Sequence, residues 1–238
     1  MIVSTKGIVL QTVKYSDNSL IAKIFTRKNG VVSFMIKNTF SKKSKQPASF
    51  FSPLTILNLV YNEPYSEKLT FLKEVNIAHP FHSISMDFKK STLLLFEQEL
   101  LKKLLYNANA PDETLFDFIT KHLIELEVSQ EIAPDFHIVF LIRLIQQLGY
   151  SPERNFSLQT SYFSIEDSNF GNCFFETPNF LSKEASFYLF NILNNHNYPL
   201  PDKKTRMELL NGMILYLMKY NKQIKGIESV NILSEILQ

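Results

Sequence analysis

The spacing of apolar residues divides the chain into a front part with a period near two and a rear part with a period near 3.6. Before His82, short runs rich in β-branched and aromatic residues predict five strands, at residues 7–13, 20–27, 31–37, 54–61 and 69–75. Asn29-Gly30 has the chemistry of a tight hairpin between the second and third strands, so the first three strands should form a meander. Five short antiparallel strands predict a small closed barrel, and their spacing is compatible with either an OB-fold or an SH3-like barrel.

After His82 the apolar residues recur at helical spacing. This pattern predicts helices at residues 86–106, 112–128, 135–148, 182–194, 202–222 and, more weakly, 229–237. Asp112 and Asp135 lie where N-caps are expected, and Gly149 lies where a C-terminal cap belongs. The predicted fold class is therefore α+β, with a barrel domain at residues 1–80 and a helical bundle domain at residues 81–238.

A segment between the third and fourth predicted helices, at about 150–180, has neither period. Turn signals at Ser168-Asn169 and Gly171-Asn172 predict a hairpin between YFSIE and NCFFET. We interpret the segment as a small insert whose aromatic residues form a local hydrophobic core, in preference to a binding platform; these residues are Phe156, Tyr162, Phe163, Phe170, Phe174 and Phe175.

The charges are divided at nearly the same place as the apolar pattern. The whole chain has a net charge of +2, but residues 1–82 sum to +7 and residues 83–238 to −5. This asymmetry favours a polyanionic partner for the front part. The alternative is a lysine-rich solvated surface that has no partner.

The most concentrated positive charge lies in the loop KNTFSKKSKQ, at residues 37–46, which contains no acidic residue. Lysines on such a loop can follow a nucleic-acid backbone while aromatic rings stack on bases, so binding should tolerate any sequence. Phe40 is the candidate ring, and Phe50 or Phe51 is a further one unless they belong to the barrel core. The candidate cations are Lys37, Lys42, Lys43 and Lys45, with a possible extension along Lys6, Lys14, Lys23, Arg27 and Lys28.

Signatures of catalysis are missing from the sequence. Six glycines form neither a dinucleotide fingerprint nor a phosphate loop, and there is no HExxH or GxSxG motif. His79 and His82 flank Pro80, where a linker role outweighs metal ligation. Glu125 and Glu127 diverge around a predicted helix, which indicates a solvated face. We therefore expect no enzyme activity, no metal and no cofactor.

The compartment is expected to be the cytoplasm. The sequence shows no secretory signal at MIVSTKGIVLQ, and its longest apolar run, at residues 213–218, is far too short to span a bilayer. The single cysteine, Cys173, fits a reducing compartment.

Four phrases of the chain resemble the bacterial RecO recombination-mediator proteins. They are TKGIVLQTVKYSDNSLIAKIFTRKNGVVSFMIKN, LKEVNIAHPF, GYSP and IESVNILSEIL, and together they extend over nearly the whole chain. The resemblance rests on order and spacing, because none of the phrases is a catalytic signature. It implies an N-terminal OB-fold followed by a helical domain.

The resemblance also implies a function. RecO-like proteins bind single- and double-stranded DNA and anneal complementary strands, which implies a location at the nucleoid. With a RecR-like partner they help load RecA onto DNA covered by single-stranded-DNA-binding protein, and they have no active site.

In the helical domain the resemblance implies a groove for the acidic, hydrophobic C-terminal tail of single-stranded-DNA-binding protein. A cation is needed at the rim of such a groove, and Arg143 in FLIRLIQQ and Lys121 are the candidates. The alternative for Arg143 is that its long stem covers its own helix.

The sequence departs from the family in the insert. Some relatives hold a zinc module there with four cysteines, whereas this chain has FSLQT in place of the first pair and at most Cys173 of the second. The insert should instead be held by its aromatic residues. Two other classes of function stay open: a plain nucleic-acid-binding OB-fold protein, which includes RNA binding, and a protein-interaction scaffold whose lysines serve solubility.

Overall fold

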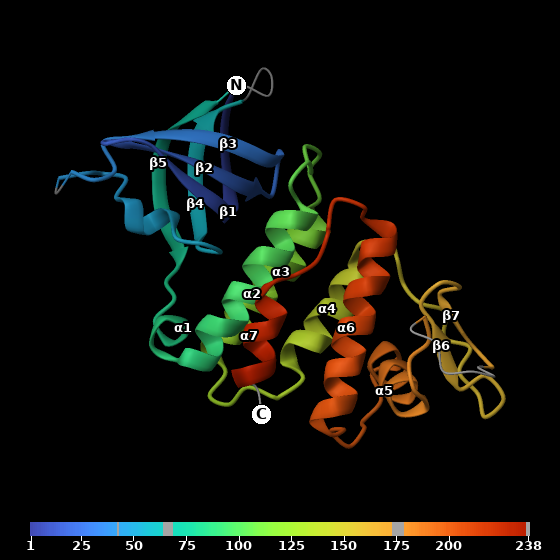
Figure 1. The fold of residues 1–238 in the computed structure, drawn as a ribbon. Coiled ribbons are helices and arrows are strands. Elements are labelled where there is room, and N and C mark those ends of the chain that lie inside the picture. The colour runs from blue at the N-terminus through green and yellow to red at the C-terminus, as the bar shows by residue number, and fades with distance from the viewer. Residues whose placement is uncertain (42, 64–68, 173–178, 237–238) are drawn as a thin grey trace. The chain divides into compact units, whose positions relative to one another are not determined.

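The computed structural model of the chain describes residues 1–41, 43–63, 69–172 and 179–236, which form two compact units, Met1–Gln130 and Glu131–Gln238. The first unit contains a closed barrel of five strands (Figure 1). The strands are β1 (Ile2–Ser16), β2 (Ser19–Thr26), β3 (Gly30–Lys37), β4 (Ile56–Asn62) and β5 (Thr70–His79).

The order of the strands identifies the barrel as an OB-fold. The neighbours around the barrel are β1-β2-β3-β5-β4, and β4 closes onto β1. All pairs are antiparallel except β3 and β5, which run parallel. This pair connects the β1–β2–β3 meander to the antiparallel pair of β4 and β5. The strand spacing in the sequence is compatible with either an OB-fold or an SH3-like barrel. The observed strand order is that of the OB-fold.

The first strand is longer than its apolar pattern predicted. Its first half pairs with β4 and its second half with β2, and a register shift between Val9 and Gln11 separates the two halves. Such an irregularity bends a strand, which lets β1 take part in both sides of the closed sheet. Residues 2–6 alternate between exposed and half-buried positions, so they carry little of the apolar signal.

The barrel is filled by side chains from every strand. Phe34 and Tyr61 meet edge to face with ring centroids 4.9 Å apart, and the Tyr61 hydroxyl donates to the Asn29 Oδ1 at 2.8 Å. The other members of the buried core are Val9, Leu20, Ala22, Ile24, Val32, Ile36, Phe51, Leu57 and Leu59.

Three helices complete the first unit: α1 (Ser83–Met86), α2 (Phe88–Leu104) and α3 (Glu113–Val128). Figure 1 shows α2 and α3 side by side next to the barrel. The helix predicted at 86–106 begins after Asp87, whose carboxylate caps α2 by accepting the backbone N–H groups of Lys89 and Lys90, and the short α1 before it was not predicted. On the barrel side, the Phe25 and Phe116 rings lie 5.7 Å apart and link β2 to α3.

The turn between β2 and β3 contacts the loop between α2 and α3 very closely. Gly30 has φ +65°, a conformation that favours glycine, and a Cβ atom there would lie 2.4 Å from the Ala108 carbonyl oxygen. The next residue, Val31, donates its backbone N–H to the same oxygen at 2.8 Å. The predicted tight hairpin is present, with Arg27, Lys28 and Asn29 between the paired residues Thr26 and Gly30.

Glu127 corrects an expectation from the sequence, because it is not simply part of a solvated face. Its carboxylate accepts the backbone N–H groups of His82, Ser83 and Ile84 at 2.8, 2.8 and 2.9 Å. Partial burial acts to raise the pKa of Glu127, but these three hydrogen bonds outweigh it and hold the pKa below its ordinary value. The buried Lys90 ammonium donates to the carbonyl oxygen of Glu127 at 3.0 Å.

The second unit is built on α4 (Phe136–Gln147), α5 (Lys183–Asn194), α6 (Lys203–Tyr220) and α7 (Ser229–Ile236). Seven of the twelve residues are buried in α4 and seven of twelve in α5, so both helices contribute heavily to the core of the unit. Gly149 follows α4 with φ +82°, as its predicted role of C-terminal cap requires.

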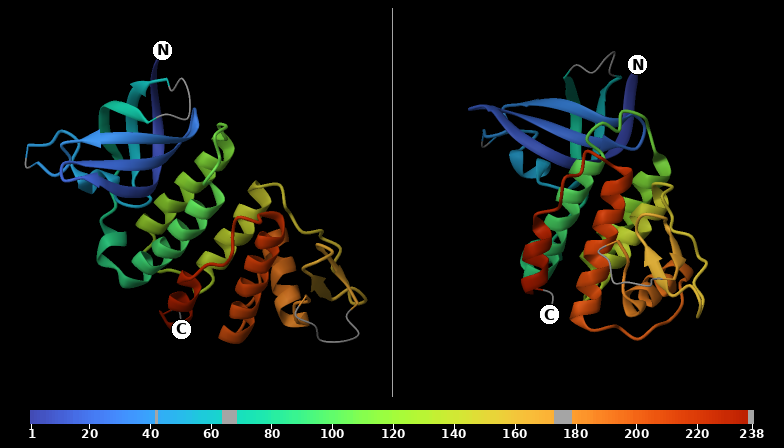
Figure 2. Two further views of the ribbon diagram at one scale, coloured as in Figure 1. Left: turned by 45° about the horizontal axis from the view of Figure 1, so that its top comes forward. Right: turned by 45° about the vertical axis from the view of Figure 1, so that its right-hand side comes forward.

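The insert contains a short hairpin of β6 (Tyr162–Ser164) and β7 (Asn169–Gly171), which lies beside α5 (Figure 2). The second strand comes earlier than predicted, since β7 occupies the residues expected to form the turn, and most of NCFFET lies outside the described residues. The aromatic cluster is present: the Phe156 ring stacks on Phe190 at 5.0 Å and meets Phe170 at 5.5 Å.

The Glu127 cap leads to a prediction about stability. Glu127→Gln removes the charge that accepts three backbone N–H groups, so the free energy of unfolding should fall by about 1–2 kcal/mol at neutral pH. The pKa of Glu127 is depressed in the folded protein, so its contribution is present above the ordinary value of 4.5 and is lost as the pH falls through the lower folded value. Urea unfolding should therefore show a difference between the two proteins that shrinks on acidification.

The control for this experiment is Glu125→Gln, which changes the same charge on the same helix at an exposed position. It should shift the free energy of unfolding by less than about 0.5 kcal/mol. Equal losses in the two variants would contradict a specific role for the Glu127 carboxylate.

Candidate nucleic-acid interface and a groove in the second unit

The outer face of the barrel carries a row of apolar side chains that runs across four strands. Val13 is paired with Ile21, Ile21 with Met35, and Met35 with Phe71, so all four lie on the same side of the sheet. Phe71 is 54% exposed and Tyr15, two residues beyond Val13 on β1, is 63% exposed. Strands two and three form the face on which OB-folds bind oligonucleotides.

The lysine loop is tied to the same end of the barrel at two points. Thr39 donates its backbone N–H to the Asn18 carbonyl oxygen at 3.2 Å, which fixes the start of the loop beside the β1–β2 turn. Gln46 donates its side-chain amide to the Leu72 carbonyl oxygen at 3.4 Å, next to Phe71. The loop therefore begins beside the β1–β2 turn and ends beside Phe71, which belongs to the row of apolar side chains.

Three of the four lysines predicted to lead the interface are described, and all three are exposed. Lys37 ends β3 with its ammonium 5.0 Å from the centre of the Phe71 ring, so that a cation and an aromatic face are presented together. Lys43 and Lys45 lie on the tethered loop, and Lys42 lies outside the described residues.

The lysines predicted to extend the path take three different positions. Lys14 lies near the β1–β2 turn and pairs with Asp17 at 3.1 Å, on an exposed surface where such a pair is weak. Lys23 lies in the middle of β2, with its ammonium 3.7 Å from the centre of the Tyr106 ring. Lys6 lies on the half of β1 that pairs with β4, beyond the apolar row.

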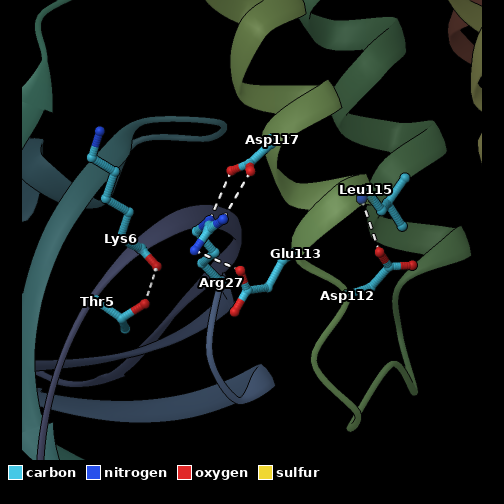
Figure 3. A network of polar contacts seen from close by, with 7 residues as sticks. All are labelled: Thr5, Lys6, Arg27, Asp112, Glu113, Leu115 and Asp117. Carbon is cyan, nitrogen blue, oxygen red and sulfur yellow. Dashed lines mark hydrogen bonds and ion pairs between the residues drawn. The ribbon is translucent and has the colours of Figure 1, made fainter.

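Arg27, another of the predicted cations, is paired with acidic residues of α3 (Figure 3). Its guanidinium donates to both carboxylate oxygens of Asp117 at 2.9 Å and lies 2.7 Å from a Glu113 oxygen. The hydrogen bonds from Arg27 lower the pKa of Asp117. The positive charge of Arg27 is balanced by the two carboxylates of α3, so Arg27 is not a member of the proposed nucleic-acid interface. Lys28 shares this turn, roughly 23 Å along the strands from Lys37.

The aromatic candidates also separate into exposed and buried rings. Phe40 is half-exposed on the lysine loop, as predicted. Phe51 is fully buried and Phe50 packs against the barrel core, so the alternative role holds for both. Tyr15 and Phe71 were missed, because a run of alternating apolar residues does not say which face of a closed sheet meets solvent.

A groove of about 500 Å³ lies in the second unit, between the start of α4 and the end of α5. Its lining mixes apolar and polar side chains, and one guanidinium, that of Arg143, is among them. The lining residues are Ala133, Pro134, Asp135, Val139, Arg143, Ile192, Asn195, His196, Asn197, Tyr198 and Leu200.

The acidic group in the groove is already bonded within the chain. Asp135 Oδ2 accepts the hydroxyls of Tyr188 at 2.7 Å and Tyr198 at 3.1 Å. Burial and the carboxylate raise the pKa of Tyr198 to about 12, so this hydroxyl stays a donor at neutral pH. The Asp135 carboxylate thus has two hydroxyl donors within the chain and keeps its negative charge in the groove.

The two residues predicted to hold a partner's tail belong to different units of the chain. Arg143 is half-buried in the groove wall, and its Nη2 donates to the Asn195 side-chain oxygen. Lys121 is exposed on α3 in the first unit and is not among the residues that line the groove. Asn195 and Tyr198 were missed, since nothing in NNHNYPLP signals a contact with α4 or with its N-cap residue, Asp135.

Two further observations concern metals and membranes. Among the described residues, no group of three or more His, Cys, Asp or Glu side chains is placed to hold a metal ion. Of the helices within the described ranges, none combines the length and the apolar character that crossing a membrane requires.

Comparisons with known proteins assign both parts of the chain. The family profile described as "Recombination protein O N terminal" matches residues 1–81, and "Recombination protein O C terminal" matches residues 85–172. The chain is 31% identical over 240 residues to "DNA repair protein RecO" of Flavobacterium psychrophilum, which covers 99% of both chains. Proteins with the same name in Flavobacterium johnsoniae and Bacteroides fragilis are 29% identical over 99% of the chain and 31% identical over 71% of it.

The barrel topology and these matches define an OB-fold protein of DNA repair and recombination. The chain belongs to the RecO family, because the two profiles together match more than half of it and a RecO relative matches nearly all of it. The resemblance noted in the sequence is confirmed.

Proposed function

We propose that the protein is a recombination mediator that binds single- and double-stranded DNA without sequence preference and anneals complementary strands. The observation that carries the proposal is the exposed row on the OB barrel, where Phe71 lies beneath the Lys37 ammonium and the lysine loop is tethered alongside. Aromatic faces accept any base and ammonium groups accept any phosphate. The mediator role needs no covalent chemistry, so the proposal includes no catalytic residue and no cofactor.

The interface has two kinds of contact with different tasks. Lys37, Lys43 and Lys45 neutralise phosphates, which lowers the repulsion between two strands held near each other. Tyr15 and Phe71 hold bases by stacking and leave their Watson–Crick edges available for pairing. Strands held in this way can exchange partners, as annealing requires.

The partners follow from the family. We propose that a RecR-like protein acts with this chain to bring RecA onto DNA coated by single-stranded-DNA-binding protein, which places the protein at the nucleoid. The groove of the second unit is proposed to hold the acidic C-terminal tail of the coating protein. The apolar part of its lining suits the tail's apolar side chains, and Arg143 suits a carboxylate.

The stacking contact is tested by Phe71→Ala. Loss of the ring removes a stacking surface and the support of Lys37, so affinity for single-stranded DNA should fall by about 1–3 kcal/mol. Fluorescence anisotropy with a labelled oligonucleotide measures this change. Phe88→Ala is the control, because Phe88 is even more exposed than Phe71 but lies on α2, outside the row of apolar side chains on the barrel. Unchanged affinity in the Phe71 variant would remove the row from the interface.

The mediator proposal as a whole is tested by annealing of complementary strands that are already coated with single-stranded-DNA-binding protein. The parent should anneal them, and a variant with Lys42, Lys43 and Lys45 changed to Glu should not, because like charges repel the strands. A control with Lys89, Lys203 and Lys225 changed to Glu has the same charge change on exposed helix and loop positions and should keep most of the activity.

Other outcomes of this assay identify the other classes of function. Binding to bare strands without annealing of coated ones would favour a plain nucleic-acid-binding OB-fold protein. Tighter binding to RNA than to DNA would point to the same class with a different ligand. A protein that neither binds nor anneals would be a protein-interaction scaffold, and the mediator proposal would fail.

The groove is tested separately with a labelled tail peptide. Arg143→Ala should weaken binding about tenfold, since it removes a charge-assisted contact to the carboxylate. Arg154→Ala removes an exposed arginine of the same unit that does not line the groove, and it should bind as the parent does. Equal binding by the parent and the Arg143 variant would exclude Arg143 as the contact.

A further inference from the structure

We infer that the Asn195 side chain is an internal stand-in for the ligand's carboxylate, so that binding in the groove exchanges one acceptor of Arg143 for another. This inference rests on the proposed function of the groove and adds a residue that sets its selectivity. It arises from one contact, in which Arg143 Nη2 donates to Asn195 Oδ1 within the residues that line the groove.

The backbone fixes where the Asn195 side chain lies. Asn195 is the C-cap of α5 in the left-handed conformation, with φ +57° and ψ +32°, and its N–H donates to the carbonyl oxygens of Asn191 and Ile192. His196 also donates its N–H to the Asn191 carbonyl oxygen, at 3.0 Å. The amide is therefore held at the end of a helix, facing a guanidinium from α4.

The chemistry of the pair makes it easy to displace. An amide oxygen is neutral and offers one atom, whereas a carboxylate is charged and can accept two parallel N–H groups from a guanidinium. A carboxylate that further contacts hold in the groove should therefore replace Asn195 at Arg143. A ligand without one has to leave Asn195 in place and loses the contact.

The exchange gives the groove selectivity for one class of ligand. Any anion has to displace the Asn195 amide before it can bind Arg143, so a carboxylate alone gains little binding free energy there. A chain that also places an apolar side chain against Val139, Ile192 or Leu200 gains enough to displace the amide. The ligand class is thus a peptide whose carboxylate and apolar side chain lie close together, as they do at a C-terminus.

Two substitutions test the inference without disturbing the helix end, because glycine, asparagine and aspartate all tolerate the left-handed conformation. Asn195→Gly removes the competing oxygen and should tighten binding of the acidic tail peptide about three- to tenfold. Asn195→Asp places a permanent carboxylate beside Arg143 and should weaken binding about tenfold. Fluorescence anisotropy with the full chain measures both.

The same peptide with an amidated C-terminus is the matched probe. It lacks the terminal carboxylate, so its weaker binding should be nearly the same in the parent and in both Asn195 variants. Thermal unfolding of the three proteins checks that the helix end is intact. An aspartate variant that binds as tightly as the parent would show that Arg143 does not exchange partners.

The outcomes separate this inference from the proposed function of the groove. If the parent binds the peptide, Arg143→Ala weakens it and both Asn195 variants match the parent, the groove stands and the inference is overturned. If Arg143→Ala binds as the parent does, or if neither the parent nor Asn195→Gly binds, the proposed function fails and the inference fails with it. Opposite shifts in the glycine and aspartate variants support both.

Discussion

The structure of the first unit depends on one close approach, that of the β2–β3 turn to the loop between α2 and α3. Gly30 has no space for a Cβ atom beside the Ala108 carbonyl oxygen, and Val31 donates a hydrogen bond to that oxygen. Arg27 extends the contact to the carboxylates of α3. One end of the barrel thereby packs against the helices, and Lys37 and the lysine loop lie at the other end, where the nucleic-acid interface is proposed.

This packing of one end of the barrel against the helices explains why cations that are close in sequence make different contacts. Arg27 presents five donors in a planar fork that matches carboxylates, and the structure uses it for an ion pair within the chain. The lysines at the opposite end are flexible point charges that can follow an irregular backbone. A single count of positive charge before His82 therefore overstates the cations available to DNA, since some of them hold the unit together or lie beyond the apolar row.

Much of the fold follows from the sequence, because period and turn chemistry are local. The strands, the helix ends at Asp112 and Gly149, and the aromatic core of the insert were all predicted. The predictions failed where contacts join distant segments: Glu127 caps a helix more than forty residues earlier in the chain, and Arg27 pairs with Asp117 ninety residues later. The exposure of Phe71 and the contact of Asn195 with Arg143 likewise depend on how the chain closes on itself.

The two candidate sites share a physical property, which is that neither depends on a strong buried charge. The barrel offers exposed lysines and single stacking rings, whose individual contributions are small and are weakened by salt. The groove offers one guanidinium that already has a neutral partner. The proposed function, in which the protein brings strands together and then leaves them, requires the release of every contact, and weak, exchangeable contacts allow such release. A buried ion pair with DNA or with a tail would hold the product in place, because separating it would leave a desolvated charge behind.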